Sequence, residues 1–511
     1  MKLVMINIYP DGTAAKYLLS SYVLLAYLKE HLPNYDELGA EVLNFGREVG
    51  IADICGQIVN KNPDCVAYSC YTWNIDKVQS IIRLLQHTMT RVVHILGGPE
   101  ISSGMSMSCP PTIYHIIGEG ERKFSLLISN LMGEDACHRY TSSITDLDTI
   151  PSVYLSGVLP DHLYSRQQAM LETQRGCRYR CRYCVYHKHL PSIRYYSEER
   201  IIEELDYLII QKQVMAIRIL DAVFTSDLPR AKRIVRHLVE LKDKGIRLPW
   251  IYWEFTYQDV DEEFISLVSS LKQRERILNT AEVAPLDRPQ LYSDLLKDYT
   301  AISSVGIQSF NKQSLKAVRR AKVDMVELGA FMDMAKKHNI VLKLDIILGL
   351  PFETFDTYFQ ALEEFIPYFE DTDHILNIHL LSILPGSELG DLCEKYEIEY
   401  DKEAPYLALS TNGFSKEELS YASKLSAVLF RILNSPLRGR FFAVKRCTEY
   451  NFLYIIAKIL DRINNIPEFR DTRIVCSEYV DDEYWNGDIY QDIPSEWLIG
   501  VLQGVLEYYG H

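Results

Sequence analysis

The sequence predicts an α/β protein with two successive parallel-strand domains and a mainly helical C-terminal domain. Short apolar runs of strand type alternate with segments of helical apolar spacing up to about residue 395. Such alternation is typical of parallel sheets covered by helices. Beyond residue 396 the longest periodic segments are helical. We therefore expect a doubly wound sheet over residues 1–150, a partial (β/α)6 barrel over 165–395 and a helical domain over 396–511.

Composition narrows the class of protein. The chain has 511 residues, 47% of them hydrophobic, and a formal net charge of −15. This charge argues against a nucleic-acid partner held by phosphate contacts. No run of 18 apolar residues appears, and the N-terminus leads directly into a strand, so we expect neither a membrane span nor a signal peptide. Eleven cysteines in so long a chain do not suggest a disulfide scaffold.

The first 150 residues alternate strand and helix signals. A doubly wound sheet built from them would place its ligand beyond the carboxyl ends of the strands. The expected strands are 2–8, 66–71, 92–96 and 114–117, and the expected helices are 14–32, 53–60 and 78–87.

Small residues cluster where these strands end. A single glycine after a strand is usually only a turn, but here several strand ends share the feature. Glycine lets a ligand approach the backbone closely. We therefore take Gly97, Gly98, Gly118 and Gly120 as candidate ligand-binding residues, and add Ser69 and Tyr71, which end the preceding strand.

The most informative motif is C-x3-C-x2-C, formed by Cys177, Cys181 and Cys184 directly after a strand-like run. Thiolates are soft ligands suited to iron–sulfur clusters. Three of them can hold three irons of a [4Fe–4S] cube, which leaves the fourth iron open to a second molecule. The alternative is a structural zinc site, for which His187 would be the fourth ligand.

With the aromatic Tyr183 before its last cysteine, this motif resembles the signature of the radical S-adenosylmethionine (radical SAM) superfamily. The resemblance implies a [4Fe–4S] cluster whose open iron is chelated by SAM, and cleavage of SAM to a 5′-deoxyadenosyl radical. It also implies an electron donor such as flavodoxin or ferredoxin. An oxygen-labile cluster favours a reducing compartment, so we expect a cytoplasmic protein.

The barrel is predicted from six strand-type runs, at 169–173, 216–220, 250–254, 303–308, 342–348 and 375–381. Sites in such barrels lie at the carboxyl ends of the strands. Strand by strand, these ends resemble the radical SAM barrel of the cobalamin-binding subgroup. That likeness implies that Glu254 binds the SAM ribose, that Gln308 and Ser309 lie near its methionine moiety, and that Asp221 lies near the SAM-bearing face.

The N-terminal strand ends resemble the cobalamin-binding domain that precedes many radical SAM domains. One departure is clear. The usual D-x-H-x-x-G loop, whose histidine coordinates cobalt from below, is absent, and residues 9–17 contain no histidine. The resemblance therefore implies bound cobalamin whose lower axial position is water or empty.

The C-terminal domain is expected to contain helices over 416–433, 452–463 and 495–509, with an acidic, aromatic stretch over 476–492. The end of the barrel together with this helical tail resembles a group of cobalamin-binding radical SAM proteins that have a C-terminal domain of unassigned role. Cys55, Cys65 and Cys70 form no C-x2-C pattern, and we interpret them as buried thiols rather than ligands of a second cluster.

These features favour a cobalamin-dependent radical SAM enzyme, a C-methyltransferase acting on an unactivated carbon. Three alternatives stay open: a non-methylating rearrangement or ring contraction, a methylthiotransferase, and a corrinoid- or metal-binding sensor. The helical, acidic tail fits a methylthiotransferase poorly. The substrate is expected to be a small molecule or a peptide.

Overall fold

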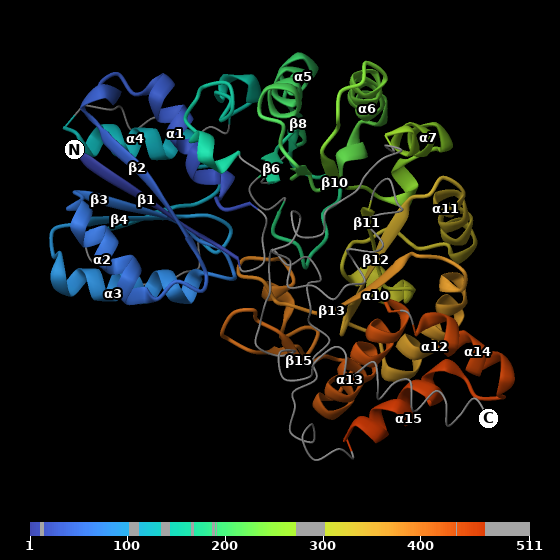
Figure 1. Cartoon of the computed structure of the whole chain (residues 1–511). Coiled ribbons are helices and arrows are strands. Elements are labelled where there is room, and N and C mark those ends of the chain that lie inside the picture. The colour runs from blue at the N-terminus through green and yellow to red at the C-terminus, as the bar shows by residue number, and fades with distance from the viewer. Residues whose placement is uncertain are drawn as a thin grey trace.

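A computed structural model of the chain shows two parallel sheets in sequence, each flanked by helices (Figure 1). It describes residues 1–464 apart from 11–14, 102–111, 134–143, 165–167, 187–189, 191, 272–301 and 436. The expected helix over 495–509, the acidic stretch over 476–492 and His187 all lie outside the described residues.

The N-terminal sheet has five parallel strands in the order β2-β1-β3-β4-β5. The strands are β1 (Lys2–Tyr9), β2 (Gly39–Gly46), β3 (Cys65–Ser69), β4 (Val93–Gly97) and β5 (Ile113–Ile116). Four of them were expected from the sequence. The fifth, β2, was not, because it is an edge strand whose residues are mostly only partly buried, so it lacks the continuous apolar run of its neighbours.

Helices cover both faces of this sheet. On one face α1 (Leu19–His31) and α4 (Glu121–Leu131) pack against Leu3 and Met5 of β1. On the other, α2 (Ile51–Lys61) and α3 (Ile75–Thr88) pack against Val4 and Ile6. Alternate residues of β1 thus enter two different cores, as a doubly wound sheet requires.

The second sheet has six parallel strands in the order β13-β12-β11-β10-β9-β6, an open partial barrel as expected. The strands are β6 (Gln168–Leu171), β9 (Ala216–Ile219), β10 (Trp250–Glu254), β11 (Ile302–Gln308), β12 (Val341–Leu348) and β13 (Ile375–Leu380). Its outer helices include α5 (Glu198–Asp206), α6 (Leu228–Asp243), α7 (Glu262–Ser270), α10 (Lys312–Ala317), α11 (Met325–Lys337) and α12 (Phe355–Phe365) (Figure 1). Ser197 caps α5 as predicted, because its side chain accepts the N–H of Arg200 at 3.3 Å.

The C-terminal segment is not a separate hydrophobic unit. It contains α13 (Lys416–Leu433), α14 (Arg438–Cys447) and α15 (Phe452–Asn464), together with a short hairpin of β14 (Glu399–Tyr400) and β15 (Ala408–Ser410) that the sequence did not predict. Buried residues of α13, such as Leu425 and Leu429, share one core with barrel residues such as Leu344. The hairpin also reaches the N-terminal sheet, since the Tyr406 hydroxyl donates to Glu100 Oε2 at 2.8 Å.

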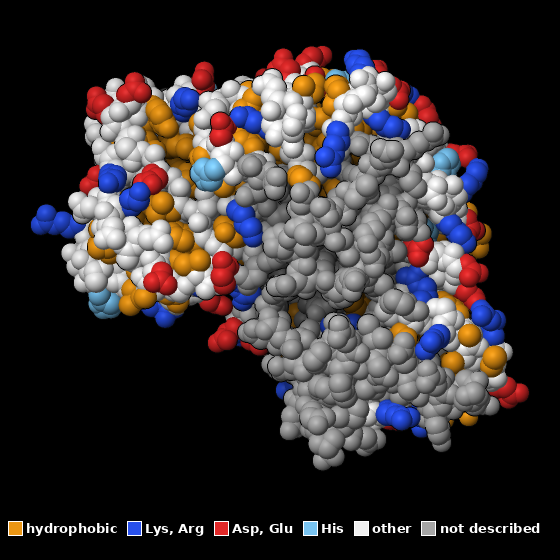
Figure 2. Space-filling model, viewed as in Figure 1, with side chains coloured by type: hydrophobic (Ala, Val, Ile, Leu, Met, Phe, Trp, Pro, Cys, Tyr) orange, Lys and Arg blue, Asp and Glu red, His pale blue; other side chains and the backbone are white. Residues whose placement is uncertain are grey.

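The described surface carries interspersed charges. In the view of Figure 2, Lys and Arg side chains are scattered among acidic ones rather than gathered in one stripe. Within the described residues, we find no helix with the length and apolarity needed to traverse a bilayer.

Candidate functional site

The three cysteines lie on a loop with a short two-stranded stem. The stem pairs β7 (Gln174–Arg175) with β8 (Arg194–Tyr195) in antiparallel fashion, so that Arg175 faces Arg194. Gly176, the first residue of the loop, has a φ of +97°, and a Cβ there would lie 2.6 Å from the Ser192 carbonyl oxygen. Only glycine fits this turn without strain.

Asp221, just beyond β9, holds the chain that leads into this loop. Its Oδ1 accepts the N–H groups of Thr173 at 2.8 Å and Gln174 at 3.1 Å, and its Oδ2 accepts the Thr173 hydroxyl at 2.5 Å. The residue is only 1% exposed, and burial raises the pKa of its carboxyl to about 7. Protein groups thus bind both oxygens of the residue that the sequence places near the SAM-bearing face, and this geometry indicates that Asp221 positions the chain.

The three thiols differ in exposure and influence one another electrostatically. Cys181 is buried and Cys177 and Cys184 are partly exposed. Burial is the main reason that the pKa of the Cys184 thiol is raised to about 12, and the nearby Cys181 and Cys177 contribute to this rise. Such mutual influence places the three sulfurs within electrostatic reach of each other.

The donor set fits a cluster better than a single ion. Among the described residues no three His, Cys, Asp or Glu side chains converge as ligands of one metal ion. A zinc ion needs its sulfur ligands at about 2.3 Å and hence close together. A [4Fe–4S] cube binds each cysteine to a different iron, so its sulfurs stand farther apart.

Arg320, which the sequence analysis missed, lies beside the cysteines. Its Nη1 is 3.7 Å from Cys181 Sγ and its Nη2 donates to the Gly306 carbonyl at 2.6 Å. The guanidinium also lies over the Tyr179 ring, 4.9 Å from its centroid. Burial alone would lower the pKa of this group, but the neighbouring Tyr183 and Cys181 raise it overall, which holds Arg320 as a cation next to the thiols. Its signal in the sequence is weak, because it follows its strand by twelve residues.

The predicted barrel residues divide into two groups. Glu254, at the end of β10, lies close enough to raise the pKa of Cys184, after burial and the other two thiols. Gln308 ends β11 with a φ of +72°, and its amide occupies the space that a side chain at Gly306 would fill. Ser309 is buried and donates to Glu353 Oε1 at 2.5 Å. The structure therefore brings Glu254 and Gln308 to the cysteine side, whereas the Ser309 hydroxyl serves a protein contact.

The loop arginines mostly bind protein. Arg178 donates to Asp259 at 2.8 Å and to the Ser226 carbonyl at 2.5 Å. Arg182 donates to the Ala317 carbonyl at 2.7 Å. Tyr183, the motif's aromatic residue, packs against the barrel core. These contacts hold the loop over the strand ends.

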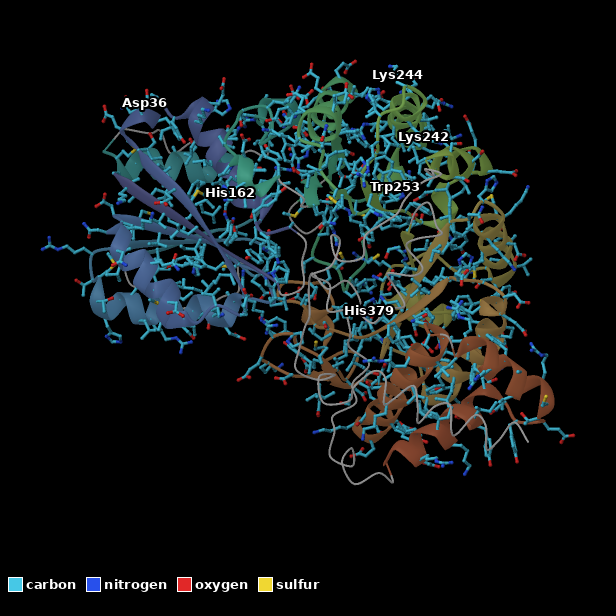
Figure 3. The ribbon with its side chains drawn as sticks, viewed as in Figure 1. Asp36, His162, Lys242, Lys244, Trp253 and His379 are labelled. Carbon is cyan, nitrogen blue, oxygen red and sulfur yellow. The ribbon has the colours of Figure 1, made fainter. Side chains whose placement is uncertain are left out.

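A polar group on the inner face of the barrel was also missed by sequence reasoning. The Asn377 amide donates to Asp345 Oδ1 at 2.6 Å, and His379 Nε2 lies 3.2 Å from the same oxygen. Asn377 is fully buried, yet its Oδ1 has no hydrogen-bond partner in the part of the chain that the structure describes. In the β11–β12 register, Asp345 lies opposite Gly306, whose carbonyl binds Arg320. The polar group therefore begins on the strand beside the one that ends at Gln308. Figure 3 labels His379.

The N-terminal candidates gather at the carboxyl edge of the first sheet. Ser69 Oγ lies 3.0 Å from Ser20 Oγ, and the Tyr71 hydroxyl donates to Ser20 at 3.4 Å. The Tyr71 ring stacks on Trp73 at 4.2 Å. Gly98 has a φ of +114°, and a Cβ there would lie 2.4 Å from the Cys70 carbonyl oxygen, so glycine is required by the fold itself.

The other predicted glycines lie at the ends of β4 and β5. Gly97 ends β4, and Gly118 and Gly120 enclose Glu119 between β5 and α4. Gly118 has a φ of +77°. Cys65 and Cys70, by contrast, pack into the two opposite cores of this sheet.

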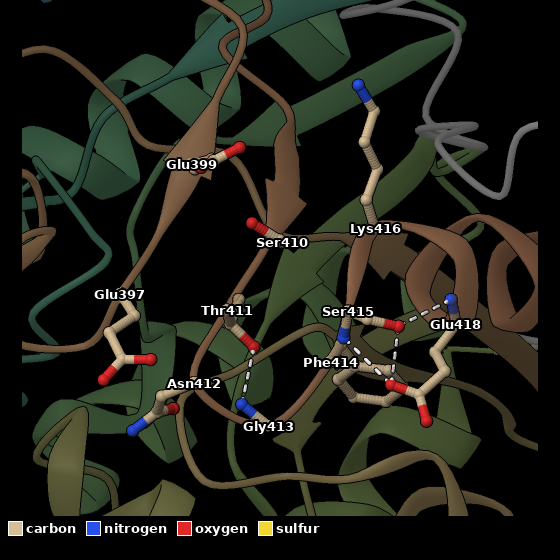
Figure 4. A pocket seen from close by; sticks show the side chains of 10 residues that line it. All are labelled: Glu397, Glu399, Ser410, Thr411, Asn412, Gly413, Phe414, Ser415, Lys416 and Glu418. Atoms are coloured by element: carbon tan, nitrogen blue, oxygen red, sulfur yellow. Dashed lines mark hydrogen bonds between the residues drawn. The ribbon is translucent and has the colours of Figure 1, made fainter.

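A hollow beside the β14–β15 hairpin is lined by 397, 399, 410–416 and 418 (Figure 4). Ser415 and Glu418, on its wall, form the capping box of α13. Asn412, also on the wall, accepts the Phe352 N–H at 2.9 Å. These residues serve the local fold, and the hollow is lined by none of the cysteine-loop residues.

Comparison with known proteins agrees with this geometry. Residues 21–128 match the family described as B12 binding domain, and residues 171–365 match the radical SAM superfamily. The chain is 23% identical over 356 residues to the cobalamin-dependent radical SAM methyltransferase TokK of Streptomyces tokunonensis, covering 64% of this chain and 48% of that protein. It thus spans about half the length of this curated relative.

Two solved structures share the fold. The cobalamin-dependent S-adenosylmethionine radical enzyme OxsB aligns with a TM-score of 0.62 and 15% identity, over 99% of this chain and 79% of its own. The radical S-adenosylmethionine methyltransferase TsrM from Kitasatospora setae aligns with a TM-score of 0.56 and 13% identity, over 80% of each chain. This protein therefore combines an N-terminal B12-binding domain with a radical SAM domain behind it.

Proposed function

We propose that this protein is a cobalamin-dependent radical SAM methyltransferase that methylates a carbon atom of a small-molecule substrate. The observation that carries the proposal is the meeting of two sites. The Glu119 loop of the B12-binding domain contacts Arg175, two residues before the first cysteine of the radical SAM motif. Both cofactors would then face the same space, as transfer between them and one substrate requires.

Cys177, Cys181 and Cys184 would hold a [4Fe–4S] cluster with one iron open to SAM. When bound, the cluster supplies the electron that cleaves SAM. Arg320 is a fixed cation beside Cys181, well suited to the SAM carboxylate, and Glu254 offers a carboxylate to the ribose hydroxyls. Gln308 ends β11, the strand that pairs with β10 beside Glu254.

Cobalamin would lie against the carboxyl edge of the first sheet, near Ser69, Tyr71 and the glycines after β4 and β5. When bound, it supplies the methyl group. The loop after β1 contains no histidine, so the strand-end residues named above would hold the corrinoid. Positioning the two cofactors and excluding water is the protein's share of such chemistry.

The substrate would contact Asp345, Asn377 and His379. Within the described residues, Asn377 and His379 both bind Asp345 through Oδ1, and Asn377 Oδ1 has no hydrogen-bond partner of its own among them. A ligand that donates hydrogen bonds, such as an amine or a hydroxyl, would complement the Asp345 carboxylate and the Asn377 amide oxygen. Asp345 lies on the strand beside Gln308, so a substrate bound there would be next to SAM rather than on it.

The proposal keeps the three domains at 1–150, 165–395 and 396–511, although the last shares its core with the barrel. Asp221 and Ser309 position the chain around the site. Reduction would come from an electron donor such as flavodoxin or ferredoxin in the cytoplasm.

The test is anaerobic reconstitution with iron, sulfide and hydroxocobalamin, followed by metal counting and incubation with SAM and a reductant. We expect about four irons and one cobalt per chain, and release of 5′-deoxyadenosine. A deuterated methyl group on SAM should then appear on carbon in the substrate. Iron without cobalt would overturn the methyltransferase proposal, and a rearranged product without label would favour ring contraction or rearrangement.

Variants separate the SAM side from the substrate side. Arg320→Met should lower 5′-deoxyadenosine release in the absence of substrate at least tenfold, because the variant loses a charged contact to SAM. Asp345→Asn should leave that release within about twofold of the wild type, since Asp345 lies on the strand beside the one that Arg320 contacts and is assigned to the substrate. An equal loss in both variants would contradict the assignment.

A further inference from the structure

A buried ion-pair cluster joins the B12-binding domain to the stem of the cysteine loop. Arg175 contacts Glu121 at 2.7 Å, Glu119 at 3.0 Å and Glu172 at 3.0 Å. Arg194 contacts Glu119 at 2.9 Å. We call these five residues the stem cluster. Each of the five side chains is at most one-fifth exposed.

The charges of the stem cluster depend on one another, because one carboxylate serves both arginines. Arg175 and Arg194 are directly opposed across the β7–β8 ribbon, where two like charges repel. Glu119 offsets this by accepting from both, with Oε1 bonded to Arg175 and both oxygens bonded to Arg194. Removing Glu119 would take the carboxylate partner from Arg194, which faces the second buried cation Arg175, so the stem depends on a residue from the other domain.

The stem cluster adjoins both proposed cofactor sites, the cobalamin site of the N-terminal domain and the SAM site of the cysteine loop. Glu119 lies between Gly118 and Gly120, in the loop that we assign to cobalamin, and Glu121 begins α4. Arg175 lies two residues before Cys177, and the stem encloses all three cysteines. Glu119 contacts Arg175 and Arg194 of the stem directly. A shift of the Glu119 loop on binding a corrinoid would therefore be passed to the cysteine loop through these ion pairs.

We propose that the stem cluster couples cobalamin binding in the N-terminal domain to SAM binding at the cysteine loop, so that each ligand raises the affinity for the other. The inference rests on the proposed function, since it needs both ligands to bind. Linkage requires the two effects to be equal. Arg175 and Glu119 are positioning residues here, because they act through the loops they hold.

The experiment uses the full chain with its cluster reconstituted anaerobically. The dissociation constant of SAM is measured by equilibrium dialysis with and without saturating hydroxocobalamin. That of hydroxocobalamin is measured by visible absorbance with and without SAM. We expect both affinities to rise by the same factor, about fivefold or more.

Glu119→Gln and Glu121→Gln keep the side-chain shape and remove charge. Each should bring the coupling factor close to one while both ligands still bind, a change that a merely structural role would not produce. Glu198→Gln is the matched control, because its partner Arg233 lies 2.5 Å away on the exposed surface. It should keep the wild-type factor.

The outcomes are distinguishable. Equal SAM affinity with and without hydroxocobalamin in the wild type would overturn the coupling and leave the proposed function standing. Coupling that persists in both Gln variants would overturn the role of the stem cluster. Failure of the wild type to bind hydroxocobalamin would overturn the proposed function and the coupling together.

Discussion

Asp221 accepts the backbone N–H of Thr173 at 2.8 Å, which ties the end of β9 to the chain that enters the cysteine loop. Thr173 is held from its other side by Arg230, whose guanidinium donates to its hydroxyl and its carbonyl at 3.1 Å each. The loop therefore leaves the sheet from a buried polar support rather than from a free turn.

Asp221→Ala should destabilise this support. Three donors, the two N–H groups and the Thr173 hydroxyl, would lose their acceptor. Leaving buried donors unsatisfied costs about 1–3 kcal/mol each, so we expect about 3 kcal/mol lower stability, measured by urea unfolding. Iron incorporation should also fall. The exposed Asp243→Ala is the control, and an unchanged iron content in Asp221→Ala would contradict the positioning role.

Cys181→Ala should abolish cluster assembly, because the two remaining thiols cannot hold the cube and leave one iron open. Iron per chain, measured after anaerobic reconstitution, should fall to near zero, and 5′-deoxyadenosine release should disappear. Cys447 is an exposed free thiol and Cys447→Ala should retain both. Retained SAM cleavage in Cys181→Ala would refute the cluster assignment.

Much of this architecture was predictable because its signals are local. The cysteine spacing, the glycines after β4 and β5, and the apolar runs of the barrel strands are all read within a few residues. The helix over Lys416–Leu433 appears with the bounds predicted, since Ser415 and Glu418 form a capping box at its start.

What the sequence did not predict depends on contacts between distant segments. Arg175 meets Glu119 across 56 positions and Tyr406 meets Glu100 across 306. No spacing rule links such pairs. Asp221 shows the same limit from the other direction. Its position at a strand end suggested that it lies near the SAM-bearing face. Only the three-dimensional arrangement shows that its carboxylate accepts the N–H groups of Thr173 and Gln174.

Cobalamin bound in the reduced cob(II)alamin form should show no protein nitrogen on cobalt. The reason is that residues 9–17, where a ligating histidine would stand, contain none. Electron paramagnetic resonance of the anaerobic complex checks this, because a coordinated imidazole splits the cobalt lines further. Protein ¹⁵N labelling supplies the control. A splitting that changes on labelling would show that another histidine reaches the metal.

Stability should fall as pH rises through the titration of Glu353. This carboxyl is 2% exposed, and among the described residues its one hydrogen-bond donor is Ser309, while Oε2 has no partner there. Burial raises its pKa from 4.5 to about 8. Between these values the folded protein keeps a proton that the unfolded chain has lost, so the stability contributed by Glu353 is complete below pH 4.5 and is lost by about pH 8.

Each pKa unit corresponds to about 1.4 kcal/mol, so the loss amounts to several kcal/mol. Glu353→Gln, which stays neutral, should remove this part of the slope when unfolding free energies are compared from pH 5 to about pH 8. Glu240 is exposed, and Glu240→Gln should leave the wild-type slope unchanged. Parallel curves for Glu353→Gln and the wild type would mean that the carboxyl ionises in the fold as it does in water, through a water or ligand that satisfies Oε2.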